Sequence, residues 1–340
     1  MGCTSKQTEE TALITLPNPK PPGELEVFQI PPVLWKERRL IATDNFIVSN
    51  SATPDTLFRV FDRETMTYLG GFGREGDGPD DFRLISSSTF NPSGDLLFVG
   101  GMKTTHIMEL KREKGNQSQF SVHKLESFKV PGELMPWNWS FKLNDSIFAG
   151  VKSFYSENEL TTYNVNTSEI ESMIPFPDYA PHLESKYNHV LYQNRLQYSG
   201  GRNKVVIAYL FYPAFRIYDV ETKEAIDFHI DTDFEQLKVW ETGDGQNLNL
   251  PDLYTYYKKV LVTDNHIYAF YQIVSGPNTG SHVLSNLELH IFDFNGELIH
   301  NMRLEDWMWS CAISKDDQYM YFWHPEREDK LYRYSLEELF

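Results

Sequence analysis

One pattern of strands and turns recurs six times from residue 38 onward, and it constrains the fold more than any other feature of this sequence. In the first copy, an apolar strand leads through Thr-Asp-Asn into a second strand (LIATDNFIVSN, 40–50), and a third strand ends in a polar turn (LFRVFDRET, 57–65). The fifth copy repeats both parts as VLVTDNHIYAF (260–270) and LELHIFDFNGE (287–297). Such repeats indicate one supersecondary unit that packs against copies of itself.

The polar residue that ends the third strand gives the period of the repeat. Its six copies are Asp62, Glu109, Asn164, Asp219, Asp293 and Ser335. They lie on average about 55 residues apart, which is longer than the usual repeat of a four-stranded propeller blade. The additional residues fall in loops, chiefly 231–256 and 272–286. We therefore predict an all-β fold, a six-bladed β-propeller with four-stranded antiparallel blades. The predicted blades cover residues 38–73, 82–130, 136–177, 188–230, 257–305 and 307–340.

The last repeat supplies only three strands, which raises the question of how the ring closes. An open ring would expose the apolar faces of its two end blades to water. The segment GELEVFQI (23–30) precedes the first blade and alternates like a strand. We predict that it completes the last blade as the outermost strand, so that residues 23–340 form a single domain.

Residues 1–22 have the polar, proline-rich composition of an unstructured tether. Gly2-Cys3 followed by such a stretch resembles the end of a bacterial lipoprotein signal, which implies that Cys3 carries a lipid. An ordinary disordered start remains the alternative. The second cysteine, Cys311, lies in an apolar strand-like stretch and is expected to be a small buried side chain.

The charge balance excludes two classes of partner. Lys and Arg total 31 against 48 for Asp and Glu, a net charge of −17. Nucleic acids and anionic membrane surfaces both require a basic footprint, so neither is expected to bind. The sequence also has no apolar run long enough to span a bilayer as a helix. Membrane contact is expected only through a lipid on Cys3.

The glycine-rich segment GGFGREGDGPDDFRLISSSTFNPSGDLLFVG (70–100) carries a family resemblance. It resembles the NHL-type and TolB-like six-bladed propellers, and in particular the propeller lipoproteins of Bacteroidetes, whose function is uncharacterised. The resemblance implies a propeller in the bacterial cell envelope, held as an outer-membrane lipoprotein. Asp80 and Asp81 stand where relatives usually carry Gly-Glu, so no functional role is carried over to them.

The sequence contains few signs of catalysis. The motifs GxSxG and HExxH and the Walker phosphate loop are all absent. An alignment of the six expected inner strands gives twelve positions near the axis, and Glu37 is the one carboxylate among them. A hard cation needs more oxygen ligands than that. We therefore predict no catalytic residues, no metal and no cofactor, while the absence of enzyme activity stays open.

The same alignment predicts a binding site. PWNWSF (136–141) and DWMWSC (306–311) place a Trp-x-Trp pair in blades three and six, on opposite sides of the ring. Aromatic faces with a few polar groups suit sugar rings and peptides. The alternative is that these tryptophans pack between blades. The predicted ligand-binding residues at the mouth of the central channel are Trp137, Trp139, Trp307, Trp309, Tyr192, Tyr257, Arg39, Lys259 and Asn194.

Together these features favour an envelope-anchored, non-catalytic binding or scaffold propeller. Its expected partner is a glycan, a peptide or an envelope protein, held at one face of the ring by a monomer. The first alternative is a hydrolase or lyase that acts on a carbohydrate or lactone in the channel. A purely structural assembly protein is the second, since propellers serve all three classes of function.

Overall fold

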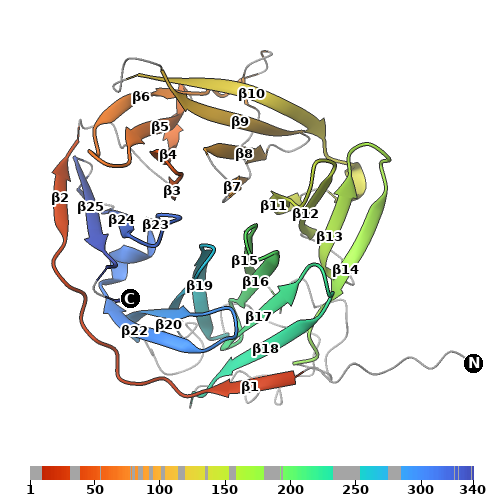
Figure 1. Cartoon of the computed structure of the whole chain (residues 1–340), viewed down its shortest axis with the longest axis vertical. Helices are drawn as coiled ribbons and strands as arrows, with labels where there is room; N and C mark the ends of the chain where they lie inside the picture. The colour runs from red at the N-terminus through yellow and green to blue at the C-terminus, as the bar shows by residue number, and fades with distance from the viewer. Residues whose placement is uncertain are drawn as a thin grey trace, which may run out of the picture.

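The chain forms a ring of six β-sheets around one axis (Figure 1). The computed structural model describes residues 10–30, 39–53, 55–76, 78, 81–82, 87–91, 95–100, 104–113, 119–134, 137–152, 158–179, 192, 194–232, 253–274, 285–324, 326–327, 329–337 and 339–340. Each sheet is one blade of a six-bladed propeller, as the repeat predicted.

Every blade runs from an innermost strand beside the axis to an outermost strand at the rim (Figure 1). The first three blades are β3 (Arg39–Ala42), β4 (Phe46–Thr53), β5 (Thr56–Asp62), β6 (Tyr68–Phe72); β7 (Ser87–Asn91), β8 (Leu96–Gly100), β9 (Thr104–Arg112), β10 (Phe120–Lys129); and β11 (Trp137–Lys142), β12 (Ile147–Lys152), β13 (Asn158–Asn164), β14 (Ile170–Pro175). The last three are β15 (Asn194–Ser199), β16 (Lys204–Tyr209), β17 (Ala214–Asp219), β18 (Ala225–Ile230); β19 (Thr255–Val262), β20 (Ile267–Val274), β21 (Leu287–Phe292), β22 (Leu298–Leu304); and β23 (Cys311–Ile313), β24 (Tyr319–Trp323), β25 (Lys330–Ser335) with β2 (Glu26–Gln29).

The core lies between the blades. In one cluster Val48 and Phe58 of the first blade pack against Leu97, Val99 and Met108 of the second. The middle strands are apolar on both faces for this reason, and β20 is buried over all but its last residue. A blade therefore reaches its stable packing only with a neighbour on each side.

The segment before the first blade supplies the outermost strand of the last blade, as predicted. Strand β2 pairs antiparallel with β25 and is the outermost strand of the last blade. The guanidinium of Arg333 on β25 holds Glu26 through two hydrogen bonds of 2.7 and 3.2 Å and lies 4.9 Å from the ring centre of Phe28. The sixth blade is thus built from both ends of the chain.

The predicted unstructured tether over residues 1–22 is corrected by the structure for residues 10–22. Strand β1 (Glu10–Ile14) pairs parallel with β18 as a fifth strand of the fourth blade. The chain then passes the fifth blade, where the Lys20 amide donates to the Asn301 carbonyl oxygen over 3.0 Å, before it reaches β2 (Figure 1). Although the composition of this segment is polar, every second side chain is apolar and partly buried: Ala12, Ile14 and Leu16. Cys3 and its predicted lipid lie outside the described residues.

The polar residue that ends the third strand has a physical role in the turn that follows. The Oδ1 atom of Asp219 accepts hydrogen bonds from the amides of Glu221 and Thr222, at 2.9 and 3.0 Å. The fourth residue after it, Lys223, then adopts a left-handed conformation with φ of 63°. Asp62, Asn164 and Asp293 accept amide hydrogen bonds in the same way. Short polar side chains are selected here because they complete the turn themselves.

The Thr-Asp-Asn turn joins neighbouring blades. Asn45 of the first blade makes two hydrogen bonds to the carboxylate of Asp95 in the second blade. Its backbone amide donates to Oδ1 over 3.0 Å, and its side-chain amide donates to Oδ2 over 2.6 Å. In the fifth blade the side chain of Asn265 donates to Asp317 of the sixth over 2.8 Å. The close similarity of the two TDN segments therefore reflects a repeated contact between blades.

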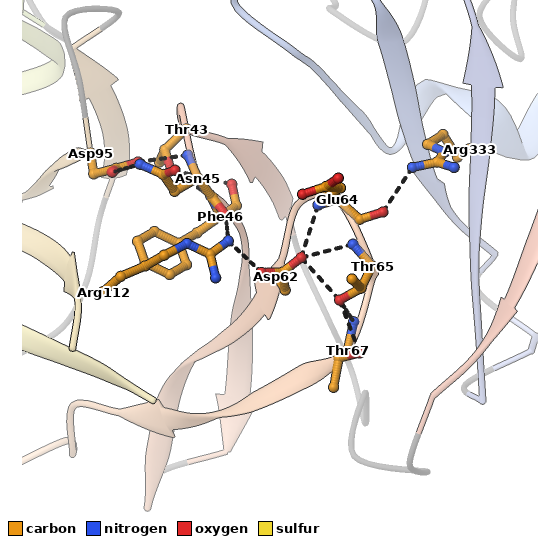
Figure 2. A network of polar contacts seen from close by, with 10 residues as sticks. All are labelled: Thr43, Asn45, Phe46, Asp62, Glu64, Thr65, Thr67, Asp95, Arg112 and Arg333. Atoms are coloured by element: carbon orange, nitrogen blue, oxygen red, sulfur yellow. Dashed lines mark hydrogen bonds and ion pairs between the residues drawn. The ribbon is translucent and has the colours of Figure 1, made fainter. Parts of the chain in front are cut away.

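Asp62 combines both roles. Figure 2 shows its carboxylate between the amides of Glu64 and Thr65 in its own turn and the guanidinium of Arg112 on β9 of the next blade. Burial raises the pKa of this carboxyl, but the hydrogen bonds from Thr65 and Arg112 outweigh it, and the pKa is lowered overall.

The Asp62→Asn variant should keep the turn and lose the ion pair with Arg112. We expect a loss of about 1 kcal/mol in the free energy of unfolding at pH 7. Because the folded-state pKa of Asp62 is lowered, its contribution is complete above the unfolded pKa of about 4 and disappears as the pH falls through the folded value. Urea unfolding of both proteins from pH 7 to pH 3 should show the difference shrink. A difference independent of pH would contradict this assignment.

Candidate functional site

Trp307 does not line the axis. Residues Asp306–Trp309 form a short 3-10 helix, η4, rather than the start of the innermost strand, which begins only at Cys311. The ring of Trp307 packs on His324 and on Tyr332 of β25, with centres 4.7 and 5.1 Å apart, and its Nε1 donates to Glu305 over 2.5 Å. This tryptophan therefore packs against side chains of its own blade.

The two predicted tyrosines are also buried in the core. Tyr257 on β19 is fully buried among Phe215, Tyr271 and His290, between the fourth and fifth blades. Tyr192 stacks on Tyr212 with ring centres 5.4 Å apart and planes 12° apart. Both side chains fill the wedge between blades, where large aromatic residues contribute most to stability.

Four predicted site residues are placed by their backbone alone. Trp137 and Trp139 lie on the innermost strand β11, where Trp137 pairs with Lys152 of β12. Asn194 begins the innermost strand β15 and pairs with Tyr209. Trp309 is the last residue of η4. The side chains of all four lie outside the described part of the structure, so their part in a site stays a prediction.

Arg39 and Lys259 lie on innermost strands of two blades. Arg39 begins β3 and Lys259 lies on β19, and both side chains are partly exposed. The Nζ of Lys259 donates to the carbonyl oxygen of Cys311 on β23, the innermost strand that lies between those two. These basic side chains are therefore predicted site residues that the structure describes on innermost strands of different blades.

Arg195 on β15 belongs to the same group and was missed from the sequence. Its Nε donates to the carbonyl oxygen of Lys258 on β19 over 3.0 Å. The sequence alignment placed the neighbouring Asn194 at this position. The sequence feature that could have pointed to Arg195 is the pair of lysines at 258–259, on the strand that Arg195 contacts.

Burial affects all three of these cations in the same direction. Burial lowers the pKa of Arg39 and is also the largest effect on Arg195 and Lys259. The positive charge of Arg39 lowers the pKa of both Arg195 and Lys259 further, although nearby Cys311 raises that of Lys259.

Cys311 is the small buried side chain that the sequence predicted. It is fully buried, and burial raises the pKa of its thiol to about 11 despite the opposing influence of Lys259. The thiol is therefore protonated at neutral pH. Among the residues that the structure describes, no group of three His, Cys, Asp or Glu side chains could hold a metal ion. None of the described helices has the length and apolarity needed to cross a membrane.

Comparisons with known proteins place the chain by fold. No family model and no curated protein matches the sequence. A member of the DUF4221 family from Bacteroides vulgatus is similar in structure, with a TM-score of 0.63 and 11% identity over 92% of this chain and 96% of that one. A putative exported protein from Bacteroides fragilis has a TM-score of 0.57 and 13% identity, over 92% of this chain and 88% of that one. The protein U3-55K has a TM-score of 0.51 and 11% identity, over 91% of this chain and 98% of that one. At such identities the likeness establishes the propeller fold alone.

Proposed function

We propose that this chain is an exported binding propeller that holds a glycan, a peptide or an envelope protein at one end of its axis. The observation that carries the proposal is that Arg39 and Lys259 both lie, partly exposed, on innermost strands of different blades. Binding residues commonly stand on such rigid scaffolds. In this proposal the predicted Trp137, Trp139 and Trp309 supply the aromatic faces of the site and the basic side chains supply its polar groups.

The location in the proposal is the bacterial envelope, with the chain held by a lipid on Cys3. Two features support it. Gly2-Cys3 precedes a polar segment, and a similar structure is named a putative exported protein. Expression of the full chain in a Bacteroides host with labelled palmitate tests the anchor. Label in the wild type and none in Cys3→Ser is the expected result, and equal label in both would refute lipidation at this residue.

Intrinsic tryptophan fluorescence tests the binding site. Host and microbial glycans, muropeptides and short peptides are titrated into the wild type and into the Trp139→Ala and Trp309→Ala variants. We expect a saturable shift that both variants lose while their melting curves stay cooperative. Trp307→Ala is the matched control, because that ring packs within blade six, and it should retain the shift. The absence of a shift with every ligand would contradict the proposed site.

A further inference from the structure

Residues 10–20 lie as a strap along the outside of the fourth and fifth blades (Figure 1). At one end β1 pairs with β18. At the other end the Lys20 amide donates to the Asn301 carbonyl oxygen over 3.0 Å, and the Arg303 amide donates to the Lys20 carbonyl oxygen over 2.7 Å. Between these ends the side chain of Asn301 donates to the Pro17 carbonyl oxygen over 2.8 Å. One side chain of β22 therefore holds the middle of the strap.

The side chain that holds Pro17 belongs to a polar group inside the molecule. The Nδ2 atom of Asn301 also donates to Oε2 of Glu288 on β21, over 3.0 Å. The same carboxylate oxygen lies 3.4 Å from Nε2 of His290. His290 is fully buried, whereas 19% of the Glu288 side chain is exposed. A series of contacts thus leads from the strap through Asn301 and Glu288 to a buried histidine.

The strap covers the place where His290 is buried. Three aromatic rings surround the imidazole, with centres 6.2, 4.8 and 6.0 Å away: Tyr257, Tyr271 and Phe292. These rings belong to the apolar cluster between the fourth and fifth blades. Partly buried side chains of the strap pack on that cluster: Ala12, Ile14 and Leu16. Departure of the strap would therefore admit water to the cluster that encloses the imidazole.

The charged neighbours of His290 can be named among the described residues. Tyr257 on β19 and Tyr271 on β20 stay neutral, because burial raises the pKa of both phenols. The fourth blade contributes apolar side chains to the cluster, among them Phe215, and the strap contributes a neutral carbonyl group. Glu288 is the charged group that acts on His290. Burial outweighs its effect, so the pKa of His290 is lowered.

Glu288 responds to acid in the same direction. Burial raises the pKa of its carboxyl, but hydrogen bonds with His290 and Asn301 and the charge of Arg303 outweigh burial, and the pKa is lowered overall. A lowered carboxyl pKa stabilises the closed state above the open-state value of about 4.3, and this contribution disappears as the pH falls. A lowered histidine pKa acts likewise below an open-state value of about 6.5. Both groups therefore weaken the closed state in acid, and the histidine does so first.

We propose that residues 10–20 form a pH-sensitive strap, held on the fourth and fifth blades at neutral pH and released in acid while the ring stays closed. In the released state His290 takes up a proton from water. Strand β2 stays in place because its pairing with β25 involves none of these contacts. If His290 titrates normally only when the strap is open, a change from pH 7.5 to pH 5.0 favours opening by up to about thirtyfold.

Release changes the length of chain between the N-terminus and the ring. With the strap in place, the first described strand begins at Glu10. After release the ring begins at β2, whose first residue is Glu26. A group attached at Cys3 would then be joined to the ring by residues 4–25 instead of residues 4–9. The added segment gives about 55 Å of further reach at full extension.

Hydrogen–deuterium exchange of the full chain at pH 7.5 and pH 5.0, corrected for intrinsic exchange rates, tests the inference. Three amides donate across the contacts between strap and ring: Lys20, Arg303 and Asp231. We expect their protection to fall by about tenfold or more at pH 5.0, within the limit set by the histidine, and protection in the middle strands β16 and β20 to stay unchanged. Unchanged protection at the strap would overturn the inference. An equal loss in β16 and β20 would mean that acid unfolds the whole ring, and would overturn it too.

Variants test whether His290 is the sensor. His290→Gln keeps a neutral polar side chain and should remove most of the acid response of the strap. His106→Gln is the matched control. Burial also lowers the pKa of His106, but this side chain lies on β9 of the second blade beside Ser127, so the variant should respond to acid as the wild type does. A normal acid response in His290→Gln, or its loss in His106→Gln, would refute the assignment.

Asn301→Ala tests the hold on the strap without changing the histidine. The variant loses the hydrogen bond to Pro17 and should lower the protection of the strap at pH 7.5 by about fivefold, the effect of one neutral hydrogen bond. Melting curves establish that each variant is folded. Wild-type protection at pH 7.5 in Asn301→Ala would show that this contact does not hold the strap, and would contradict the proposed device.

Discussion

Deletion of residues 23–30 is expected to abolish cooperative folding. The deletion removes β2 and leaves the edge of β25 in the last blade bare. It also removes Ile30 and Phe28 from the cluster that includes Tyr321 and Leu331. The expected loss exceeds about 5 kcal/mol, comparable with the whole stability of many domains. Thermal unfolding followed by circular dichroism, with light scattering for aggregation, measures it.

Deletion of residues 3–18 is the control. It removes β1, which adds a fifth strand to a blade that already has four. The variant loses the partly buried Ala12, Ile14 and Leu16 and should unfold cooperatively at a moderately lower temperature. Equal melting temperatures for the two deletions would show that β2 does not close the ring.

Arg216→Ala should cause the largest loss of stability of any single substitution considered for this chain. Arg216 on β17 is fully buried and binds both carboxylate oxygens of Asp227, at 2.6 and 2.8 Å, and the carbonyl oxygen of Pro175, at 3.0 Å. Glu159 of the third blade lies 3.6 Å away. Removal of the guanidinium leaves two buried carboxylates without their counter-charge, which costs about 3–5 kcal/mol. Urea unfolding at pH 7 measures this cost.

Two comparisons show that the loss arises from the buried charge. Lys223→Ala breaks an exposed ion pair of 3.7 Å with Glu171 and should change stability by less than about 0.5 kcal/mol. Addition of Glu159→Gln and Asp227→Asn to an Arg216→Met background removes the uncompensated charge and should recover most of the stability. No recovery in the triple variant would mean that Arg216 acts through packing volume instead.

The repeat and its turn residues were predictable from the sequence because their cause is local. Asp62, Asn164 and Asp219 each complete a turn through their own side chains, so the same residue type recurs at the same place. The closing strand was also predictable, since a three-stranded last repeat needs a partner and one alternating segment was left over.

The N-terminal segment and the site were harder to predict. Strand β1 forms because the edge of β18 offers backbone donors and acceptors, and local composition says nothing of that edge. Trp307 matched Trp137 in a sequence alignment, but η4 removes it from the inner strand and packs it on Tyr332. Arg195 was missed because its contact with the carbonyl oxygen of Lys258 joins two blades that are 63 residues apart in the sequence.

Hydrogen–deuterium exchange with and without a saturating ligand from the fluorescence titrations tests most directly the claim that the axis is the binding site. We expect slower exchange in the innermost strands β3, β11 and β19, and unchanged exchange in the outer strands β10 and β22. Trp139→Ala should remove that protection. Protection confined to the rim, or none in any strand at a concentration that saturates binding, would contradict a site at the propeller axis.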